Sequence, residues 1–191
     1  MEERYTYADY RKWAESGRWE FIDGKAYSTS FSQTEIHQTI IGELFLQLRS
    51  FLQDSACKVF MAPFDVRLNP EGADDTVVQL DIIVVCDKSK LDGNGVLGAP
   101  DLIVEVLSIS SVEIDTVRKY KKYMSAGVKE YWIIDPLNKV LMVYTLKGGK
   151  YKEKPYFKEE TNVPVATIKG CKISLADVFR EISYMEIIDM S

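Results

Sequence analysis

The chain carries the run VVQLDIIVVC at residues 77–86, a near-continuous aliphatic stretch interrupted by one carboxylate, Asp81. A second run, LIVEVL at residues 102–107, repeats the pattern with Glu105 inside it. Aliphatic runs of this kind are typical of strands that are covered on both faces. A carboxylate within such a strand needs a cation or several hydrogen-bond donors, because burial disfavours its charged form. The two runs therefore predict two interior strands, each with one inward-facing acid.

Helices and further strands are predicted on both sides of these runs. On the N-terminal side, the apolar spacing and turn signals predict a short helix, a hairpin across Asp23-Gly24, a long helix and a strand, at residues 6–15, 18–22 with 25–28, 33–52 and 59–68. On the C-terminal side, they predict a helix that ends at Gly127, two strands, an edge strand and a closing helix, at residues 110–126, 130–135 with 140–146, 151–157 and 174–182. We expect a single domain over residues 1–191, of the α/β (α+β) class, in which helices pack against a mixed central sheet.

The composition is that of an ordinary globular protein, with 46% hydrophobic and 28% charged residues in a chain of 191. At this length a core is stable without a disulfide or a structural zinc ion. Cys57, Cys86 and Cys171 are widely spaced, and His37 is the single histidine of the sequence. This pattern excludes zinc-finger and disulfide-rich secreted frameworks, and it predicts a location in the reducing cytoplasm. Neither a signal peptide nor an apolar run of the roughly 20 residues that a bilayer demands is present, so we expect no membrane association.

The charge balance restricts how the chain can bind nucleic acid. It has 24 basic and 29 acidic residues and a net charge of -5, which is the wrong sign for a protein that coats nucleic acid nonspecifically. Any phosphate-binding surface must therefore be local. The basic residues concentrate in the predicted helix and just after it, within residues 115–129, at Arg118, Lys119, Lys121, Lys122 and Lys129.

The two acids suggest a metal site if their strands are neighbours, because strands about 4.8 Å apart can bring Asp81 and Glu105 together on one face. A divalent ion is the simplest way to offset their repulsion, and carboxylate oxygens favour Mg²⁺ or Mn²⁺. Asp101 lies four residues before Glu105, roughly 13 Å away along a strand, and is assigned to the strand entrance. The alternative is that each acid pairs with a buried Arg or Lys, or ends a strand, and has no catalytic role.

Several sequence blocks together resemble one known family. They are WEFIDG at 19–24, QLDIIV at 79–84, APDLIVEVLS at 99–108, the spacing of Asp115, Lys119 and Tyr123, and GVKEYWIIDP at 127–136. This pattern is similar to that of the Uma2 family, which is assigned to the PD-(D/E)XK restriction-endonuclease-like superfamily, and the resemblance spans roughly residues 6–179. It implies a restriction-endonuclease-like core and a nuclease site at Asp81 and Glu105.

The resemblance leaves the lysine and the first acidic group of such a site to be assigned. The position two residues after Glu105, where the superfamily usually has its lysine, is Leu107, and the family match places the lysine at Lys119. On a helical wheel, the apolar stripe contains Val117, Tyr120 and Met124, with Lys119 to one side of it and Lys121 at its other edge, so Lys121 is the alternative.

The first active-site group of the superfamily comes from the helix before the sheet and is usually an acid. His37 extends the apolar stripe of helix 33–52 and is the best-placed candidate, with Glu20 on the hairpin next. A histidine on an apolar helical face is more often a hydrogen-bonded core residue, and that interpretation of His37 stays open.

The predicted function is metal-dependent hydrolysis of phosphodiester bonds in DNA. Asp81 and Glu105 are expected to hold Mg²⁺ (or Mn²⁺), with the main-chain carbonyl of Val106 as a further ligand, while the basic helix contacts the DNA backbone. A homodimer would allow one site per chain to cut both strands. One alternative is an inactive member of the same fold that binds nucleic acid or acts in an assembly, and another is a hydrolase of a smaller phosphorylated substrate.

Overall fold

The computed structural model describes residues 3–13, 17–28, 34–108 and 114–182 of the chain. Its α-helices are α1 (Tyr7–Trp13), α2 (Glu35–Phe51), α3 (Tyr120–Ala126) and α4 (Leu175–Val178). Its strands are β1 (Trp19–Ile22), β2 (Lys25–Ser28), β3 (Lys58–Met61), β4 (Asp65–Arg67), β5 (Val77–Gln79), β6 (Ile82–Val85), β7 (Gly95–Leu97), β8 (Leu102–Val106), β9 (Glu130–Asp135), β10 (Val140–Lys147), β11 (Lys150–Phe157), β12 (Val163–Pro164) and β13 (Lys172–Ile173). A 3₁₀ turn (Lys88–Lys90) follows β6, and a π-helical turn (Ile114–Lys119) leads directly into α3.

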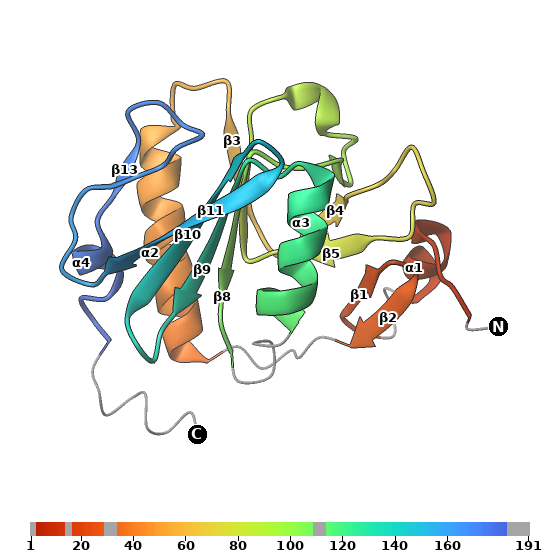
Figure 1. Cartoon of the computed structure of the whole chain (residues 1–191), viewed down its shortest axis with the longest axis horizontal. Helices are drawn as coiled ribbons and strands as arrows, with labels where there is room; N and C mark the ends of the chain where they lie inside the picture. The colour runs from red at the N-terminus through yellow and green to blue at the C-terminus, as the bar shows by residue number, and fades with distance from the viewer. Residues whose placement is uncertain (1–2, 14–16, 29–33, 109–113, 183–191) are drawn as a thin grey trace.

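The larger of the two main sheets has six strands in the order β11-β10-β9-β8-β6-β3. β8 and β9 are parallel, and all other neighbours are antiparallel. α2 and α4 pack on one face of this sheet and α3 on the other (Figure 1). Because successive side chains of a strand point to opposite faces, Val104 of β8 joins the core under α2, whereas Ile103 joins the core under α3. The predicted class, a mixed sheet flanked by helices, is confirmed.

The smaller sheet has five strands in the order β2-β1-β5-β4-β7 and contains the N-terminal hairpin. α1 packs against β1 through the rings of Tyr10 and Phe21, whose centroids lie 5.5 Å apart. The hairpin turn is at Asp23-Gly24, as predicted, with both residues at positive φ. This sheet and α3 lie side by side (Figure 1).

The prediction of one continuous strand over residues 77–86 was wrong. The run is divided between the two sheets, β5 in the smaller and β6 in the larger, with Leu80 and Asp81 in a bend between them. The run predicted over residues 59–68 divides in the same way, into β3 and β4. Its break contains Pro63, which lacks the N–H that a sheet ladder requires. The two divided runs remain paired before and after their bends, so they pass together from one sheet to the other.

The helices confirm most of the apolar patterning. α2 begins after Thr34, whose hydroxyl accepts a hydrogen bond from the backbone N–H of His37, and it buries His37 together with Ile41, Leu44 and Leu48. The helix predicted at 110–126 ends at Gly127 in the left-handed conformation, as expected. Its predicted caps, at positions 110 and 111, lie outside the described residues. The closing helix is shorter than predicted and spans only Leu175–Val178.

The structure also contains a disulfide bond that the cysteine spacing did not indicate. Cys57 and Cys86 lie just beyond the paired residues Lys58 and Val85 of β3 and β6, so the sheet register brings the two thiols together, and they are joined. Cys171 is free and buried. Within the described part of the chain, no helix is both long and apolar enough to cross a bilayer.

Candidate active site

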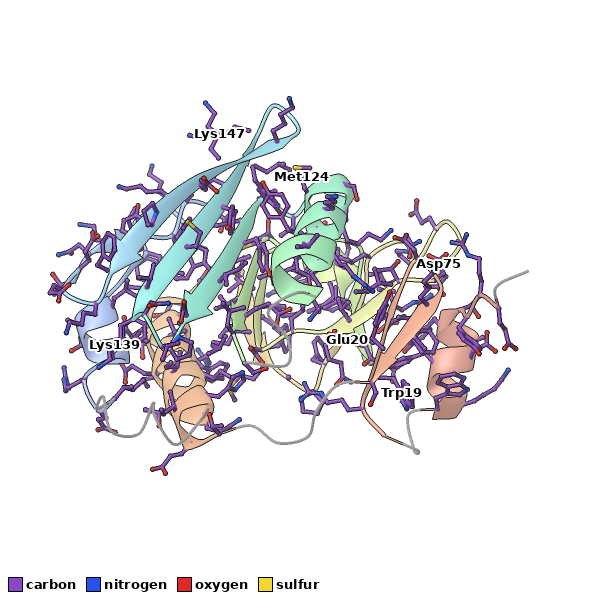
Figure 2. All side chains as sticks on the ribbon, turned by 60° about the horizontal axis from the view of Figure 1, so that its bottom comes forward. Trp19, Glu20, Asp75, Met124, Lys139 and Lys147 are labelled. Atoms are coloured by element: carbon purple, nitrogen blue, oxygen red, sulfur yellow. A yellow bond between two sulfur atoms is a disulfide. The ribbon has the colours of Figure 1, made fainter. Side chains whose placement is uncertain are left out.

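Five charged or titratable side chains are buried where the two sheets and two helices meet. They come from β1, α2, the bend before β6, β8 and the end of the π-helical turn, and each is at most 7% exposed: Glu20, His37, Asp81, Glu105 and Lys119. Figure 2 shows Glu20 between the N-terminal hairpin and the larger sheet. We call these five residues the buried cluster.

Lys119 links the two sheets through ion pairs. Its Nζ lies 2.9 Å from Oε1 of Glu105 and 2.9 Å from Oε2 of Glu20, and all three side chains are almost fully buried. The Tyr123 hydroxyl, one helical turn further on, donates to the same Oε1 of Glu105 at 3.2 Å. Burial raises the pKa of Tyr123 well above its usual value, so this phenol stays protonated and remains a donor at neutral pH.

The helical wheel predicted the burial of this segment incorrectly. Val117, assigned to the apolar stripe, is half exposed, whereas Lys119 and Tyr123 are buried. The π-helical turn Ile114–Lys119 explains the difference, because its i→i+5 hydrogen bonds change the angle between successive side chains on which the wheel depends. Lys119, which the wheel placed to one side of the apolar stripe, therefore lies inside the protein. The side chain of Asp115, the other member of the matched spacing, is outside what the structure describes.

Glu20 is fixed in position by a second layer of hydrogen bonds. Its Oε1 accepts from the backbone N–H of Gln79 at 2.9 Å, at the end of β5. The Gln79 side-chain amide donates to the Tyr10 hydroxyl at 2.9 Å and to Asp65 at 3.0 Å, while Arg18 donates to its oxygen at 2.9 Å. Burial, reinforced by Asp65, raises the pKa of Tyr10. No role for Gln79 was predicted, although it lies only two positions before Asp81 in the aliphatic run 77–86.

Asp81 and His37 form the other half of the cluster. Oδ2 of Asp81 accepts from the backbone N–H of Val106 at 2.8 Å and lies 3.3 Å from Nε2 of His37. Because Ile82 pairs with Val104, the register of β6 and β8 extends to place Asp81 opposite Glu105. Nδ1 of His37 is buried and has no hydrogen-bond partner among the described residues. Val106 is therefore adjacent to Asp81, and the role predicted for its carbonyl stays a prediction.

The remaining candidates lie outside the cluster. Lys121 is exposed and lines a groove on the outer side of α3. Asp101 accepts from the backbone N–H of Cys86 at 2.8 Å and pairs with Lys129 at 2.7 Å, at the entrance of β8, as predicted. The structure thus brings Glu20, Glu105 and Lys119 into direct contact, and His37 with Asp81, but it does not bring Lys121 to them.

The donor chemistry of the cluster fits a hard divalent cation. Glu20, Asp81 and Glu105 carry three negative charges when ionised, and Lys119 supplies one positive charge, so the set has an excess of two negative charges in a buried environment. Such an excess is unfavourable without a counter-ion, and carboxylate oxygens are the ligands that Mg²⁺ and Mn²⁺ prefer. In the described residues, no three His, Cys, Asp or Glu side chains converge closely enough to coordinate one metal. Lys119 and Tyr123 already bond to Glu105, so an ion bound there would compete with them.

Comparisons with known proteins agree with this fold. A crystal structure described as that of "a putative nuclease belonging to DUF820" from Anabaena variabilis superimposes with a TM-score of 0.68, at 18% identity, over 90% of this chain and 92% of that one. No curated protein matches the sequence. The model of the Uma2 family, described as "Putative restriction endonuclease", matches residues 7–176. That match includes all five residues of the buried cluster, and the chain belongs to the Uma2 family.

Proposed function

We propose that this protein is a metal-dependent endonuclease that hydrolyses phosphodiester bonds in DNA. The observation that supports this most directly is the contact of Lys119 with Glu105 and Glu20, beside Asp81, in a chain of the Uma2 family, whose model is described as "Putative restriction endonuclease". Acids and a lysine buried together at one point are the groups that metal-assisted phosphoryl transfer needs.

Asp81 and Glu105, with the Val106 carbonyl, would hold Mg²⁺ or Mn²⁺, and the bound ion would activate a water molecule and offset charge on the phosphate. The ammonium group of Lys119 is ion-paired with two carboxylates, which favour its charged form. Its proposed role is therefore to stabilise negative charge on the phosphate and not to remove a proton. Tyr123 and Gln79 keep Glu105 and Glu20 oriented through their hydrogen bonds. His37 orients Asp81, and its Nδ1, which has no partner among the residues that the structure describes, would hold a water or a proton.

A nicking assay tests the proposal. Wild-type protein is incubated with supercoiled plasmid in Mg²⁺ or Mn²⁺ and is compared with Asp81→Asn, Glu105→Gln and the control Glu153→Gln, which removes the charge of an exposed glutamate on β11. We expect nicking that requires the metal, a loss of about 100-fold or more in both cluster variants, and wild-type activity in the control. Equal activity of wild type and cluster variants, or no activity on DNA of varied sequence and structure, would contradict the proposal. Parallel reactions with nucleotides detect a hydrolase of small phosphorylated substrates.

A further inference from the structure

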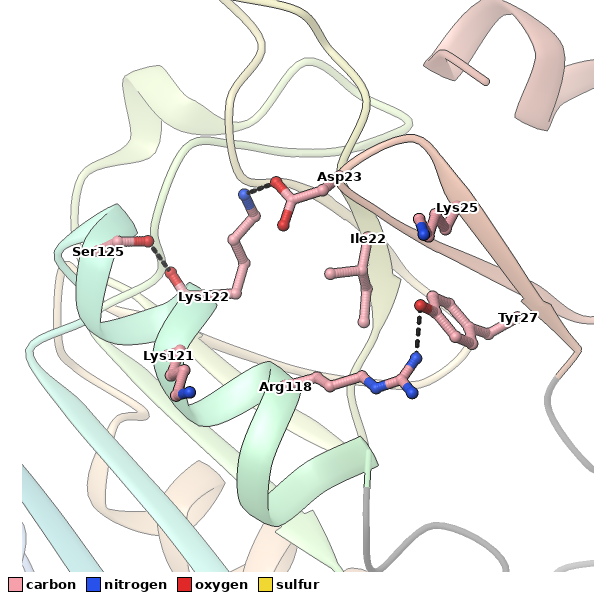
Figure 3. A pocket seen from close by; sticks show the side chains of 8 residues that line it. All are labelled: Ile22, Asp23, Lys25, Tyr27, Arg118, Lys121, Lys122 and Ser125. Carbon is pink, nitrogen blue, oxygen red and sulfur yellow. Dashed lines mark hydrogen bonds and ion pairs between the residues drawn. The ribbon is translucent and has the colours of Figure 1, made fainter. Parts of the chain in front are cut away.

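A groove of about 610 Å³ lies between the N-terminal hairpin and the outer side of α3 (Figure 3). Ile22 and Tyr27 contribute to the hairpin side, and Ser125 to the helix side. The groove also contains four cationic side chains and one carboxylate: Lys25, Arg118, Lys121, Lys122 and Asp23. This local excess of positive charge occurs in a chain whose net charge is -5, so it forms a positive surface within a negative molecule.

Contacts across the groove connect its two sides. Arg118 donates from Nη1 to the Tyr27 hydroxyl at 2.6 Å, and its guanidinium lies 5.1 Å from the centre of the Tyr27 ring. Lys122 forms an ion pair with Asp23 (Figure 3). Arg118 and Lys122 of the basic stretch thus both reach across to the hairpin. The cations are therefore held in a defined hollow.

The groove adjoins the buried cluster through neighbouring residues on both sides. Arg118 in the groove is followed directly by Lys119 in the cluster. Tyr27 pairs with Glu20 in the hairpin register, which places their side chains about 5 Å apart on the same face. The cationic surface thus begins one residue from the groups proposed to act on a phosphate.

We propose that this groove binds the phosphate backbone of the DNA strand beside the bond that is cut. The inference rests on the proposed function and adds to it the binding surface. Arg118, Lys121 and Lys122 follow one another within five residues of the chain, and all three line this one groove. Each DNA strand carries one phosphate per roughly 3.4 Å of axis, so a strand that passes the cluster presents successive phosphates to these cations.

A charge-matched pair of variants tests the groove. The groove variant combines Arg118→Gln, Lys121→Gln and Lys122→Gln, and the control combines Lys150→Gln, Lys152→Gln and Lys154→Gln on the exposed edge strand β11. Both variants lose three positive charges, and none of the six residues belongs to the buried cluster. Thermal unfolding confirms that each variant is folded. Fluorescence anisotropy with a labelled duplex in EDTA, at several salt concentrations, measures DNA affinity, and plasmid nicking in Mg²⁺ measures cleavage.

We expect the groove variant to bind DNA at least about tenfold more weakly than the control at 0.1 M salt. The slope of the logarithm of its binding constant against the logarithm of the salt concentration should be shallower by about 2.7, because each of the three lost phosphate contacts contributes about 0.9. If wild type cuts DNA but both variants bind with equal affinity, the groove assignment is wrong and the nuclease proposal stands. If wild type binds DNA through the groove without cutting it, the nuclease proposal fails and the groove assignment stands. If wild type neither binds nor cuts DNA, both fail.

Discussion

The inner and outer sides of one short helical segment differ sharply in how they hold their charges. Lys119 faces inward, is 5% exposed and bonds to two buried carboxylates. Lys121, two residues later, is exposed and lines an open groove. An inward lysine lacks water to solvate it and depends on its partners, whereas an outward lysine is solvated and available to an external anion. The same residue type is therefore held by ion pairs on one side and open to solvent on the other, and our two proposals assign it to chemistry and to DNA binding respectively.

Replacing the inward lysine should have the largest effect. Lys119→Met leaves Glu20 and Glu105 buried without their shared cation, and we expect a loss of about 3–5 kcal/mol in the free energy of unfolding, together with the loss of nicking. Lys121→Met removes an exposed charge and should change that free energy by less than about 0.5 kcal/mol. Urea unfolding of the two variants measures the difference. Similar stabilities would mean that Lys119 does not form these ion pairs in solution.

The buried charged residues of the cluster were easier to predict from the sequence than the way in which they contact one another. Asp81 and Glu105 were recognisable because a carboxylate inside an aliphatic run is unfavourable without compensation. Glu20 and His37 were alternative candidates for the first active-site group. The structure places Glu20 beside Lys119 and His37 beside Asp81. That division depends on where β1 of the smaller sheet and helix α2 pack against the larger sheet, which is a tertiary property that local sequence does not encode.

The errors have identifiable physical causes. The run at 77–86 is aliphatic on both sides of Asp81, because β5 and β6 each lie in a covered sheet, so no change in composition marks the bend between them. The burial of Lys119 depends on a π-helical turn, and the wheel assumed regular α-helical spacing. The hairpin at Asp23-Gly24 and the end of α3 at Gly127 were predictable because the left-handed backbone at those glycines has a direct residue preference.

A change to Tyr123 should have an intermediate effect on the free energy of unfolding, and it tests the hydrogen bond to Glu105 on the inner side of the segment. Tyr123→Phe removes one hydrogen bond to Glu105 but keeps the buried ring, so we expect a loss of about 1 kcal/mol at pH 7. The pKa of Tyr123 is raised in the folded state, so above about pH 10 the unfolded tyrosine releases its proton while the folded one keeps it. The free energy of unfolding should therefore fall with rising pH, and this one tyrosine should contribute about 1.4 kcal/mol per pH unit.

Urea unfolding between pH 9 and 11 tests this contribution, because Tyr123→Phe should show a shallower decline than wild type. Tyr27→Phe is a suitable control, since Tyr27 is on the outer side and bonds to Arg118 at the protein surface. If both variants show the wild-type decline, Tyr123 is accessible to solvent in the folded protein.

The smallest effect on stability is expected on the outer side, where removing an ion-pair partner should strengthen DNA binding. Asp23 is the single carboxylate that lines the groove among the described residues, and its side chain is 62% exposed, so Asp23→Asn should cost less than about 0.5 kcal/mol. Asparagine also tolerates the positive φ of this position. The change frees Lys122 and removes a charge that repels phosphate, so we expect duplex affinity to rise about two- to tenfold at 50 mM salt and less at 200 mM.

Asp54→Asn is the matched control, because it makes the same change in net charge at an exposed position outside the groove. Anisotropy titrations of both variants at the two salt concentrations compare a local effect with a general one. A gain confined to Asp23→Asn assigns the DNA backbone to the groove beside Lys122. Equal gains in the two variants would show that only the total charge matters, and the contrast between the two sides of the segment would then apply to stability but not to recognition.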